Sequence, residues 1–423
     1  MHRTLASELP ARVGQTVTIA GWAHRHRRLK SVEFLIVRDR TGLAQVVLPP
    51  SAVDSELATL VEESVVEVTG RVTANPAAPS GVELVDASVR VVNPAQPAPL
   101  DLYRPTLTAS LPTQLDHAGL ALRHPARQRV FRAGAAAVRG FRSTLDDLGF
   151  VEVHTPKIVA SATESGANVF AIDYFGRPAY LAQSPQFYKQ TLVGVFERVY
   201  EVGPVFRAEP HDTVRHLAQY TSLDVELGFI TDHRDVMAAL RSVMAGMVAA
   251  IDPSFVDTEV PEQIPSVHFV DALAMVGKAL GEDLSGEPDL APAHERWLGE
   301  WAKREYGSDF LFVEGFPAAK RPFYTHPDPS RPGYTNGFDL LFRGVELVTG
   351  GQRLHRYEDY VAALAARGES PEPYEAYLSV FRHGMPPHGG FAIGLERFLA
   401  RLTGAANIRE VTLFPRDLTR LTP

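Results

Sequence analysis

The hydrophobic pattern of this chain changes at a short proline-rich segment, and that change limits the possible folds more than any other feature. Between residues 15 and 92, apolar and polar residues alternate with a period of two, which is typical of half-buried strands. Residues 93–99 contain three prolines and are expected to form a stiff, extended linker. Beyond them, apolar residues recur every three or four positions, as on one face of a helix. The 423 residues are therefore expected to form two or three domains of different class.

The segment before the prolines is predicted to be a small β-barrel. Turn signals such as Arg40-Thr41-Gly42 separate the alternating runs, and about five short strands of this kind are typical of an OB-like barrel. The alternating positions that support this interpretation are Val17, Ile19, Gly21, Val32, Phe34, Ile36, Val66, Val68, Gly70, Val72, Val82, Leu84, Val89 and Val91.

The segment after the prolines is predicted to be an α+β domain. A long helix is expected to end near Gly149, and Phe150–Val153 is expected to form a strand that runs into Thr155-Pro156. Strand and helix patterns alternate from there onward. The residues that form one face of the long helix are Val130, Gly134, Val138, Phe141, Leu145 and Leu148.

Composition excludes several kinds of chemistry. The absence of cysteine removes disulfides, thiolate zinc sites and thiol catalysis. No run reaches the ~18 apolar residues of a membrane-spanning helix, and the N-terminal residues have no apolar stretch that would direct secretion. We therefore expect a cytoplasmic protein with no membrane partner. The net charge is −8, but the first 100 residues contain 10 basic and 10 acidic residues. A nucleic acid would thus be received better by the N-terminal part.

Three motifs carry the chemistry of the second domain. They are Val205–Glu209, which contains Phe-Arg-x-Glu, then Gly344–Arg353, then Gly394–Phe398, which contains Gly-Leu-Glu-Arg. In this order they resemble motif 2, the amino-acid pocket and motif 3 of the class II aminoacyl-tRNA synthetases. The resemblance is closest to aspartyl-tRNA synthetases of the archaeal type and covers essentially the whole chain. The spacing from Phe229 to Met385 leaves no room for the large insertion of the bacterial type.

This resemblance implies a domain organisation. It divides the chain into an OB-fold anticodon-binding domain over residues 1–93, a linker or hinge over 94–123, and a catalytic domain over 124–423 built on a mostly antiparallel sheet. The helix and strand that precede Pro156 resemble motif 1, which builds the dimer interface in that family, so a homodimer is expected. As an isolated pattern, the same helix and strand would be an ordinary αβ unit.

The first and third motifs imply an ATP site. Activation of an amino acid by ATP builds negative charge on phosphate oxygens, which fixed cations stabilise. A guanidinium fork suits phosphate, so Arg207 is expected on the α-phosphate and in contact with the amino-acid carboxylate. The resemblance places Arg397 on the γ-phosphate, and these two arginines are the predicted catalytic residues. The other predicted ATP contacts are Glu209, Arg215, His216, Leu217, Tyr220, Glu346, Gly394, Leu395 and Glu396.

Some of these contacts have specific expected roles. Glu209 lies two residues after Arg207 and is expected on the same face of a strand, where the resemblance assigns it to the adenine end of ATP. Tyr220 stands where the family usually has phenylalanine and keeps the aromatic face for adenine. Asp339, Glu346 and Thr349 are predicted to bind Mg²⁺ between the phosphates, because Mg²⁺ takes one or two carboxylates together with substrate oxygens. The alternative is a pair of salt-bridged carboxylates at strand ends.

The segment Leu181–Gln190 resembles the aspartate-specific pocket of that family. A side-chain carboxylate needs buried cations, which Lys189 and Arg353 supply. An asparagine enzyme should avoid this lysine, because a neutral amide would leave its charge unpaired at a cost of several kcal/mol. Aspartate is therefore the favoured substrate and asparagine the second. The amino group needs acceptors, which Glu164, Gln186 and Asp224 can supply. The complete set of predicted aspartate contacts is Glu164, Gln186, Lys189, Arg207, Asp224, Thr349 and Arg353. Glu164 stands in Glu-Ser-Gly, where the family commonly has Glu-Gly-Gly.

A basic hairpin in the barrel is the predicted site for tRNA. Basic side chains with an aromatic ring between them suit an unstacked single strand. By resemblance, Phe34 stacks on the central anticodon base, Gln45 reads its edge and Arg27 assists. His24 and the loop that contains Pro79 are expected near the third base. The alternative is a solvated basic hairpin with Phe34 in the core.

The family contains strict enzymes, which charge tRNA(Asp) alone, and relaxed enzymes, which also place aspartate on tRNA(Asn). Pro79 replaces a long side chain that would inspect the third base, so we expect the relaxed type, with a strict enzyme as the alternative. A tRNA-independent asparagine-forming paralogue would not need the barrel, and an inactive RNA-binding protein would not need Arg207, Glu346, Arg353 and Arg397. The expected binding partners are thus tRNA, L-aspartate and ATP, and DNA is not expected to bind.

Overall fold

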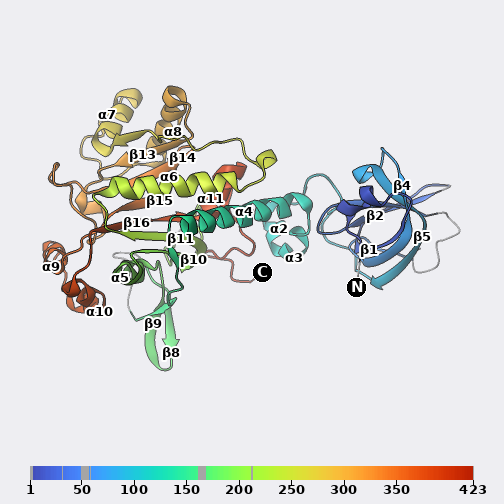
Figure 1. Cartoon of the computed structure of the whole chain (residues 1–423), viewed down its shortest axis with the longest axis horizontal. Helices are drawn as coiled ribbons and strands as arrows, with labels where there is room; N and C mark the ends of the chain where they lie inside the picture. The colour runs from blue at the N-terminus through green and yellow to red at the C-terminus, as the bar shows by residue number, and fades with distance from the viewer. Residues whose placement is uncertain are drawn as a thin grey trace. The chain divides into compact units, whose positions relative to one another are not determined.

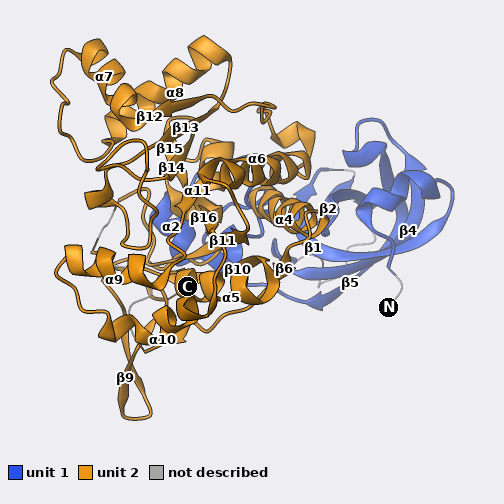
Figure 2. Ribbon diagram, turned by 60° about the vertical axis from the view of Figure 1, so that its left-hand side comes forward, with its two compact units in different colours: residues 1–128, 423 blue, residues 129–422 orange. Residues whose placement is uncertain are grey.

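The computed structural model describes residues 3–30, 32–48, 57, 59–160, 168–210 and 213–422. These residues form two compact units, one within residues 1–128 and the other within residues 129–422 (Figures 1 and 2). The division falls after residue 128, whereas the sequence placed the start of the catalytic domain at residue 124. In the described ranges, no helix is long and apolar enough to cross a membrane.

The first unit contains the predicted barrel. In its described part, five strands close in the order β1-β2-β3-β5-β4, and neighbours are antiparallel except for β3 and β5. Alternate side chains point inward and form one apolar core, which includes Ile19, Leu35, Val46, Val66 and Leu84. The OB-like fold is therefore confirmed. The strands are β1 (Thr16–Arg28), β2 (Glu33–Arg38), β3 (Leu43–Leu48), β4 (Val65–Ala74) and β5 (Val82–Asn93).

A bulge in β1 changes which side chains face outward. Ala23 pairs with Val37 and Arg25 pairs with Ile36, so His24 is an extra residue in β1. A bulge interrupts strict alternation and re-aims the residues that follow it. Ala23 is buried in the barrel, whereas the residues after the bulge present Arg25 and then Arg27 on the outer face of the β1-β2 hairpin.

The segment between barrel and second unit is more structured than the linker that was predicted for residues 94–123. It contains two short helices, α2 (Leu111–Asp116) and α3 (Ala118–Ala121). Leu100 and Leu102 are buried against Ala121 in a small separate cluster. The three prolines restrict the backbone angles of residues 93–99 only, so the residues that follow can still form helices.

The second unit is built on a large, mostly antiparallel sheet. Only the outermost pairs, β12 with β13 and β10 with β6, are parallel within the described residues. The order across the sheet is β12 (Ser266–His268), β13 (Phe310–Glu314), β14 (Gly337–Phe342), β15 (Val345–Gln352), β16 (His388–Gly394), β11 (Gln219–Gly228), β10 (Arg198–Phe206) and β6 (Val151–Glu152). The α+β class and the mostly antiparallel sheet are confirmed.

Three helices share a core with this sheet: α4 (Pro125–Asp147), α6 (His233–Ala249) and α11 (Leu395–Thr403). Helices α4 and α6 approach so closely that a Cβ at Gly140 would lie 2.2 Å from the backbone oxygen of Gly246. Figure 1 shows the two helices side by side. The predicted helix is therefore present and begins at Pro125, but it ends at Asp147, so Leu148 lies beyond its end and is 37% exposed.

Smaller elements surround the sheet. Helices α7 (Phe269–Leu280) and α8 (Pro292–Tyr306) form a second apolar cluster with β13. Helix α5 (Gln186–Phe196) contributes Val193 to a third cluster with α9 (Tyr357–Ala366) and α10 (Glu375–Leu378). A separate three-stranded sheet has the order β7 (Ile158–Val159), β9 (Arg177–Leu181) and β8 (Ala171–Tyr174).

Candidate active site

A cavity of about 550 Å³ opens on the central strands of the second unit. Strands β15, β16, β11 and β10 are consecutive neighbours in the sheet, so motifs far apart in sequence meet here. The predicted site residues that line this cavity are Gln186, Lys189, Arg207, Glu209, Arg215, His216, Leu217, Tyr220, Glu346, Thr349, Arg353, Gly394, Glu396 and Arg397. Asp224, Asp339 and Leu395 do not line it. Glu164 lies outside the described residues.

At one end of the cavity, Arg397 of the third motif contacts Glu346. Arg397 lies in the first turn of α11 and its Nη1 donates to the backbone oxygen of Glu346 at 2.9 Å and to Glu346 Oε1 at 3.2 Å. Thr349 donates its hydroxyl to the same carboxylate oxygen at 3.4 Å. The side chains of Arg397 and Glu346 are 34% and 40% exposed, so both remain accessible to a ligand.

The first motif supplies a second cation to the same cavity. Arg207 follows the last residue of β10, and its backbone NH donates to Ala218 at 2.9 Å. The Tyr220 ring centroid lies 5.8 Å from its guanidinium carbon. Since β10 ends at Phe206, the prediction that Arg207 and Glu209 share a face of a strand is wrong. Both nevertheless line the cavity, because the residues that follow the end of β10 form part of its wall.

The residues around Arg397 differ in their relation to the cavity. Glu396 is 8% exposed and accepts the Thr221 backbone NH at 3.0 Å, so it fixes α11 to β11. Burial raises the pKa of Glu396. The side chain of Leu395 packs against the main apolar core, so a direct role of this side chain in ATP binding is not favoured.

Asp339 lies behind the cavity wall, opposite Thr349 in the β14–β15 pairing. Its Oδ2 accepts from Arg321 at 2.8 Å, while Oδ1 has no hydrogen-bond partner. Burial, helped by the charge of Glu346, raises the pKa of Asp339 to about 6 although Arg321 opposes this shift. Two carboxylates that destabilise each other, one with an unsatisfied oxygen, fit a divalent cation, with Glu346 on the cavity side.

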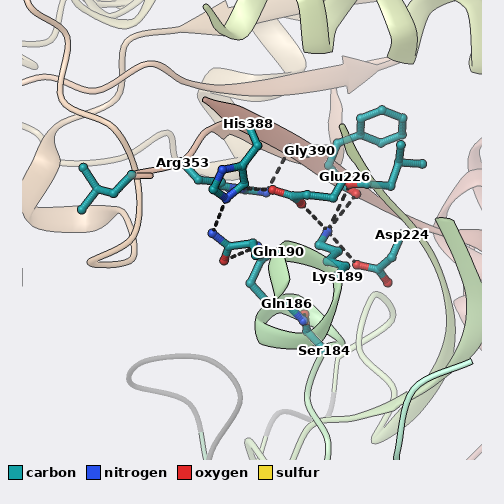
Figure 3. A network of polar contacts seen from close by, with 12 residues as sticks. Ser184, Gln186, Lys189, Gln190, Asp224, Glu226, Arg353, His388 and Gly390 are labelled. Carbon is teal, nitrogen blue, oxygen red and sulfur yellow. Dashed lines mark hydrogen bonds and ion pairs between the residues drawn. The ribbon is translucent and has the colours of Figure 1, made fainter. Parts of the chain in front are cut away.

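The opposite end of the cavity contains two buried cations (Figure 3). Lys189 Nζ lies 3.0 Å from Asp224 Oδ1 and 3.3 Å from Glu226 Oε2. Arg353 donates from Nε to Glu226 Oε1 at 3.0 Å and from Nη2 to the Gly390 backbone oxygen at 3.0 Å. The predicted pair of cations is thus brought together. Asp224 does not line the cavity itself but pairs with Lys189, which does.

Glu226, which the sequence analysis missed, joins these two cations. It is fully buried. Burial would raise the pKa of its carboxyl, but the charges of Arg353 and Lys189 outweigh that effect and hold the pKa below its usual range. A Cβ at position 390 would lie 2.1 Å from Glu226 Oε2, so glycine is required there. The signal was present: Asp224 and Glu226 are two residues apart in one strand and therefore share a face.

The outer face of the β1-β2-β3 sheet contains the predicted anticodon residues. The Arg27 guanidinium lies 5.9 Å from the Phe34 ring centroid, and Phe34 is half-buried rather than part of the barrel core. Gln45 donates its side-chain amide to Glu83 at 2.8 Å. Asn75 donates to the same Glu83 oxygen at 2.8 Å, which connects β3 to the loop that contains Pro79.

His24 is buried, unlike Arg27 and Phe34. It is 7% exposed, and its Nδ1 lies 2.9 Å from Arg38 Nη1. Arg38 in turn donates to Glu63 at 2.7 and 2.8 Å. The bulge in β1 gives the physical reason, because it adds His24 to the strand and removes it from the strict alternation. This placement does not favour the predicted contact between His24 and a tRNA base.

Comparison with known proteins agrees with this architecture. Residues 110–418 match the family described as tRNA synthetases class II (D, K and N), and residues 17–92 match the OB-fold nucleic acid binding domain. A protein of Deinococcus radiodurans named aspartate–tRNA(Asp/Asn) ligase is 45% identical over 100% of this chain and 99% of its own length. One of Thermococcus kodakarensis, named aspartate–tRNA(Asp) ligase, is 39% identical over 100% of both.

Solved structures show the same fold. The asparaginyl-tRNA synthetase of Pyrococcus horikoshii, complexed with asparaginyl-adenylate, superposes with a TM-score of 0.92 at 30% identity and covers 100% of both chains. A nucleic-acid-binding barrel and a cation-lined cavity on an antiparallel sheet define a two-part enzyme that joins a small substrate to a nucleic acid. The chain belongs to the class II tRNA synthetases of the D, K and N group.

Proposed function

We propose that this enzyme is an aspartate–tRNA ligase, which activates L-aspartate with ATP and transfers the aspartyl group to the 3′ end of tRNA. The observation that carries the proposal is the buried pair of cations, Lys189 and Arg353, at one end of the cavity. A ligand carboxylate is the group that two such cations favour. The names of the full-length relatives in Deinococcus and Thermococcus support the same amino acid.

The cavity suits the two chemical steps. In the first, an α-carboxylate oxygen of aspartate attacks the α-phosphorus of ATP, and the bond to pyrophosphate breaks. Arg207 stabilises the charge that grows on the α-phosphate, and Arg397 holds the far end of the triphosphate. In the second, a hydroxyl of the terminal ribose of tRNA attacks the activated carbonyl carbon and AMP leaves. No covalent enzyme intermediate is required.

Enzymes of this class use ATP together with a divalent metal, and Mg²⁺ is the metal that we propose here. Glu346 would hold it, with oxygens of Asp339 and Thr349 available nearby. When bound, the ion neutralises charge between the phosphates of ATP. Arg397 already contacts Glu346, so this chain brings a cation and a metal-binding carboxylate to the same phosphates.

Asparagine is disfavoured by the same cavity. An amide group offers one acceptor oxygen and no charge, and its NH₂ would face the second cation, whereas a carboxylate accepts from both. The carboxylates of Asp224 and Glu226 hold Lys189 and Arg353 in place before substrate arrives. Preorganised charges of this kind favour the anionic substrate because little reorganisation is needed on binding.

We further propose that the enzyme acts as a cytoplasmic homodimer and charges both tRNA(Asp) and tRNA(Asn). Exposed apolar side chains, including Val151 in the motif 1 strand together with Ile158 and Val195, support an interface with a second copy. Pro79 offers no side-chain donor to a third anticodon base. Most of the relatives at 39–45% identity have names that include both tRNAs.

Exchange of labelled pyrophosphate into ATP tests the amino acid. Exchange should depend on L-aspartate and proceed poorly with L-asparagine. Exchange that proceeds equally with asparagine, or with neither amino acid, would contradict the proposal.

A further inference from the structure

A chain of buried polar side chains lies behind the amino-acid end of the cavity and has no role in the chemistry described so far. It consists of Gln190, His388, Tyr360 and Tyr377, all buried, and it ends at Gln186 in the cavity wall. Figure 3 shows the part formed by Gln186, Gln190 and His388. Gln190 forms four contacts: its Nε2 contacts His388 Nε2 and Tyr360 Oη, both at 3.0 Å, and its Oε1 contacts Gln186 Nε2 at 2.9 Å and Tyr377 Oη at 3.0 Å.

The backbone determines the direction of the hydrogen bonds at His388. The Nδ1 of His388 lies 2.9 Å from the backbone oxygen of Pro386, which can only accept, so Nδ1 carries the proton. Burial lowers the pKa of His388 to about 4, so the ring is neutral at physiological pH. Its Nε2 is therefore an acceptor, and the group of Gln190 that faces it must be the NH₂.

Tyr360 imposes the same direction. Its hydroxyl donates to the backbone oxygen of Leu354 at 2.8 Å, so the phenolic oxygen can only accept from Gln190. Both NH₂ hydrogens of Gln190 are thus committed, and its carbonyl oxygen must face Gln186. An acceptor in that place requires Gln186 to present its own NH₂, which leaves Gln186 Oε1 as the acceptor of that side chain toward the cavity.

We propose that Gln190, His388 and Tyr360 are positioning residues that fix the amide orientation of Gln186, so that Gln186 Oε1 accepts a hydrogen bond from the α-ammonium group of the amino-acid substrate. An ammonium group has donors only, and an inverted amide would face it with an NH₂ and repel it. The inference deepens the proposed function and rests on it. The sequence already offers Gln186 as an acceptor for the amino group of aspartate, and the structure adds the residues that hold its amide in that orientation.

The test is a double-mutant cycle on pyrophosphate exchange. Gln190→Met keeps the length of the side chain but removes the acceptor that orients Gln186. We expect it to raise the KM for aspartate about tenfold or more, as for a lost hydrogen bond to a charged group, with little change in kcat or in the KM for ATP. In a Gln186→Glu background both side-chain oxygens are acceptors, so orientation no longer matters. There, Gln190→Met should leave the KM unchanged or lower it, because it removes an oxygen–oxygen repulsion.

Tyr377→Phe is the matched control, since Tyr377 contacts Gln190 Oε1 but does not determine its direction; its KM for aspartate should stay near that of the unchanged enzyme. If Gln190→Met does not fold, which thermal unfolding reports, Gln190→Ala gives the same comparison. An equal rise in KM in both backgrounds would overturn the relay while leaving aspartate activation intact. Absence of aspartate-dependent exchange in the unchanged enzyme would instead overturn the proposed function.

Discussion

Arg397 and Arg207 line the same cavity, and the proposed function assigns them to different phosphates of the same nucleotide. Arg397→Ala should reduce pyrophosphate exchange by at least a hundredfold, because removal of a cation from developing phosphate charge costs ~3 kcal/mol or more. Arg207→Ala should have a similar effect. Arg234→Ala is a suitable control, because that exposed arginine of α6 pairs with Asp232 at the surface. Exchange within a few-fold of the unchanged enzyme in either cavity variant would contradict the assigned roles.

Lys189 is the residue on which the choice of substrate depends most. Lys189→Met should raise the KM for aspartate steeply and narrow the preference over asparagine, since Asp224 and Glu226 would then repel a third carboxylate. The matched control is Lys157→Met, because Lys157 pairs with Glu201 at 2.8 Å outside the cavity. The measurement is kcat/KM for the two amino acids. Unchanged discrimination in Lys189→Met would show that the lysine serves the fold alone.

At the scale of the element, the β1-β2 hairpin carries the guanidinium of Arg27 beside the ring of Phe34. Phe34→Ala and Arg27→Ala should lower tRNA charging yet leave pyrophosphate exchange unchanged, because they lie in the other unit; loss of a base stack costs roughly 1–3 kcal/mol. Arg90→Ala provides a control for lost charge, since Arg90 pairs with Glu67 between β4 and β5. Equal loss of both activities would indicate damage to folding rather than to tRNA binding.

The same barrel should respond to acid through His24. Burial, reinforced by the positive charge of Arg38, lowers the pKa of His24 to about 4, against 6.5 for a free histidine. The unfolded chain therefore binds the proton more readily than the folded barrel does. The stabilisation from the neutral ring is complete above pH 6.5 and is lost as the pH falls toward 4, by up to about 3 kcal/mol.

Urea unfolding at pH 7 and pH 5 tests this dependence. With Trp297 and Trp301 replaced by phenylalanine, the fluorescence of Trp22 reports on the barrel. His24→Gln should reduce the difference between the two pH values, because an amide can face Arg38 but does not titrate. His117→Gln, at an exposed position of the same unit, should retain the difference. A barrel whose unfolding free energy does not change between the two pH values would rule out this role of His24.

These elements also show how far sequence reasoning extends. Period-two alternation predicted the barrel, and helical spacing predicted α4, because both depend on apolar burial that each segment expresses alone. The position of His24 was not predictable, because a bulge is set by the pairing of β1 with β2 and not by either strand alone. The end of β10 before Arg207 was missed for a related reason: sheet pairing, not local pattern, decides where a strand stops.

At the scale of the whole molecule, the two units divide the reaction between recognition and chemistry. The order of the motifs in the sequence predicted the cavity residues, since β15, β16, β11 and β10 bring them together as neighbours. Glu226 and the hydrogen-bond chain through Gln190 could not be assigned in the same way. Their contacts join residues up to 198 positions apart, and no local pattern specifies which buried polar groups will meet.

The final prediction concerns both units, because the proposed reading of a base in the barrel would decide which tRNA is charged in the cavity. Pro79 begins a short turn, η3 (Pro79–Gly81), between β4 and β5, and Glu83 connects this loop to Gln45. The two anticodons differ only in their third base. Proline cannot donate a hydrogen bond to that base, so we expect comparable kcat/KM values for transcripts of tRNA(Asp) and tRNA(Asn).

Pro79→Lys should then disfavour tRNA(Asn) by roughly 1–3 kcal/mol if it gains one base-edge contact. Ala77→Lys supplies the matched control, because it adds the same charge to an exposed position of the same loop and should strengthen or weaken both tRNAs alike. Pyrophosphate exchange should be the same in all three proteins. If the unchanged enzyme prefers tRNA(Asp) a hundredfold or more, the enzyme is a strict one, and its discrimination must come from residues other than Pro79.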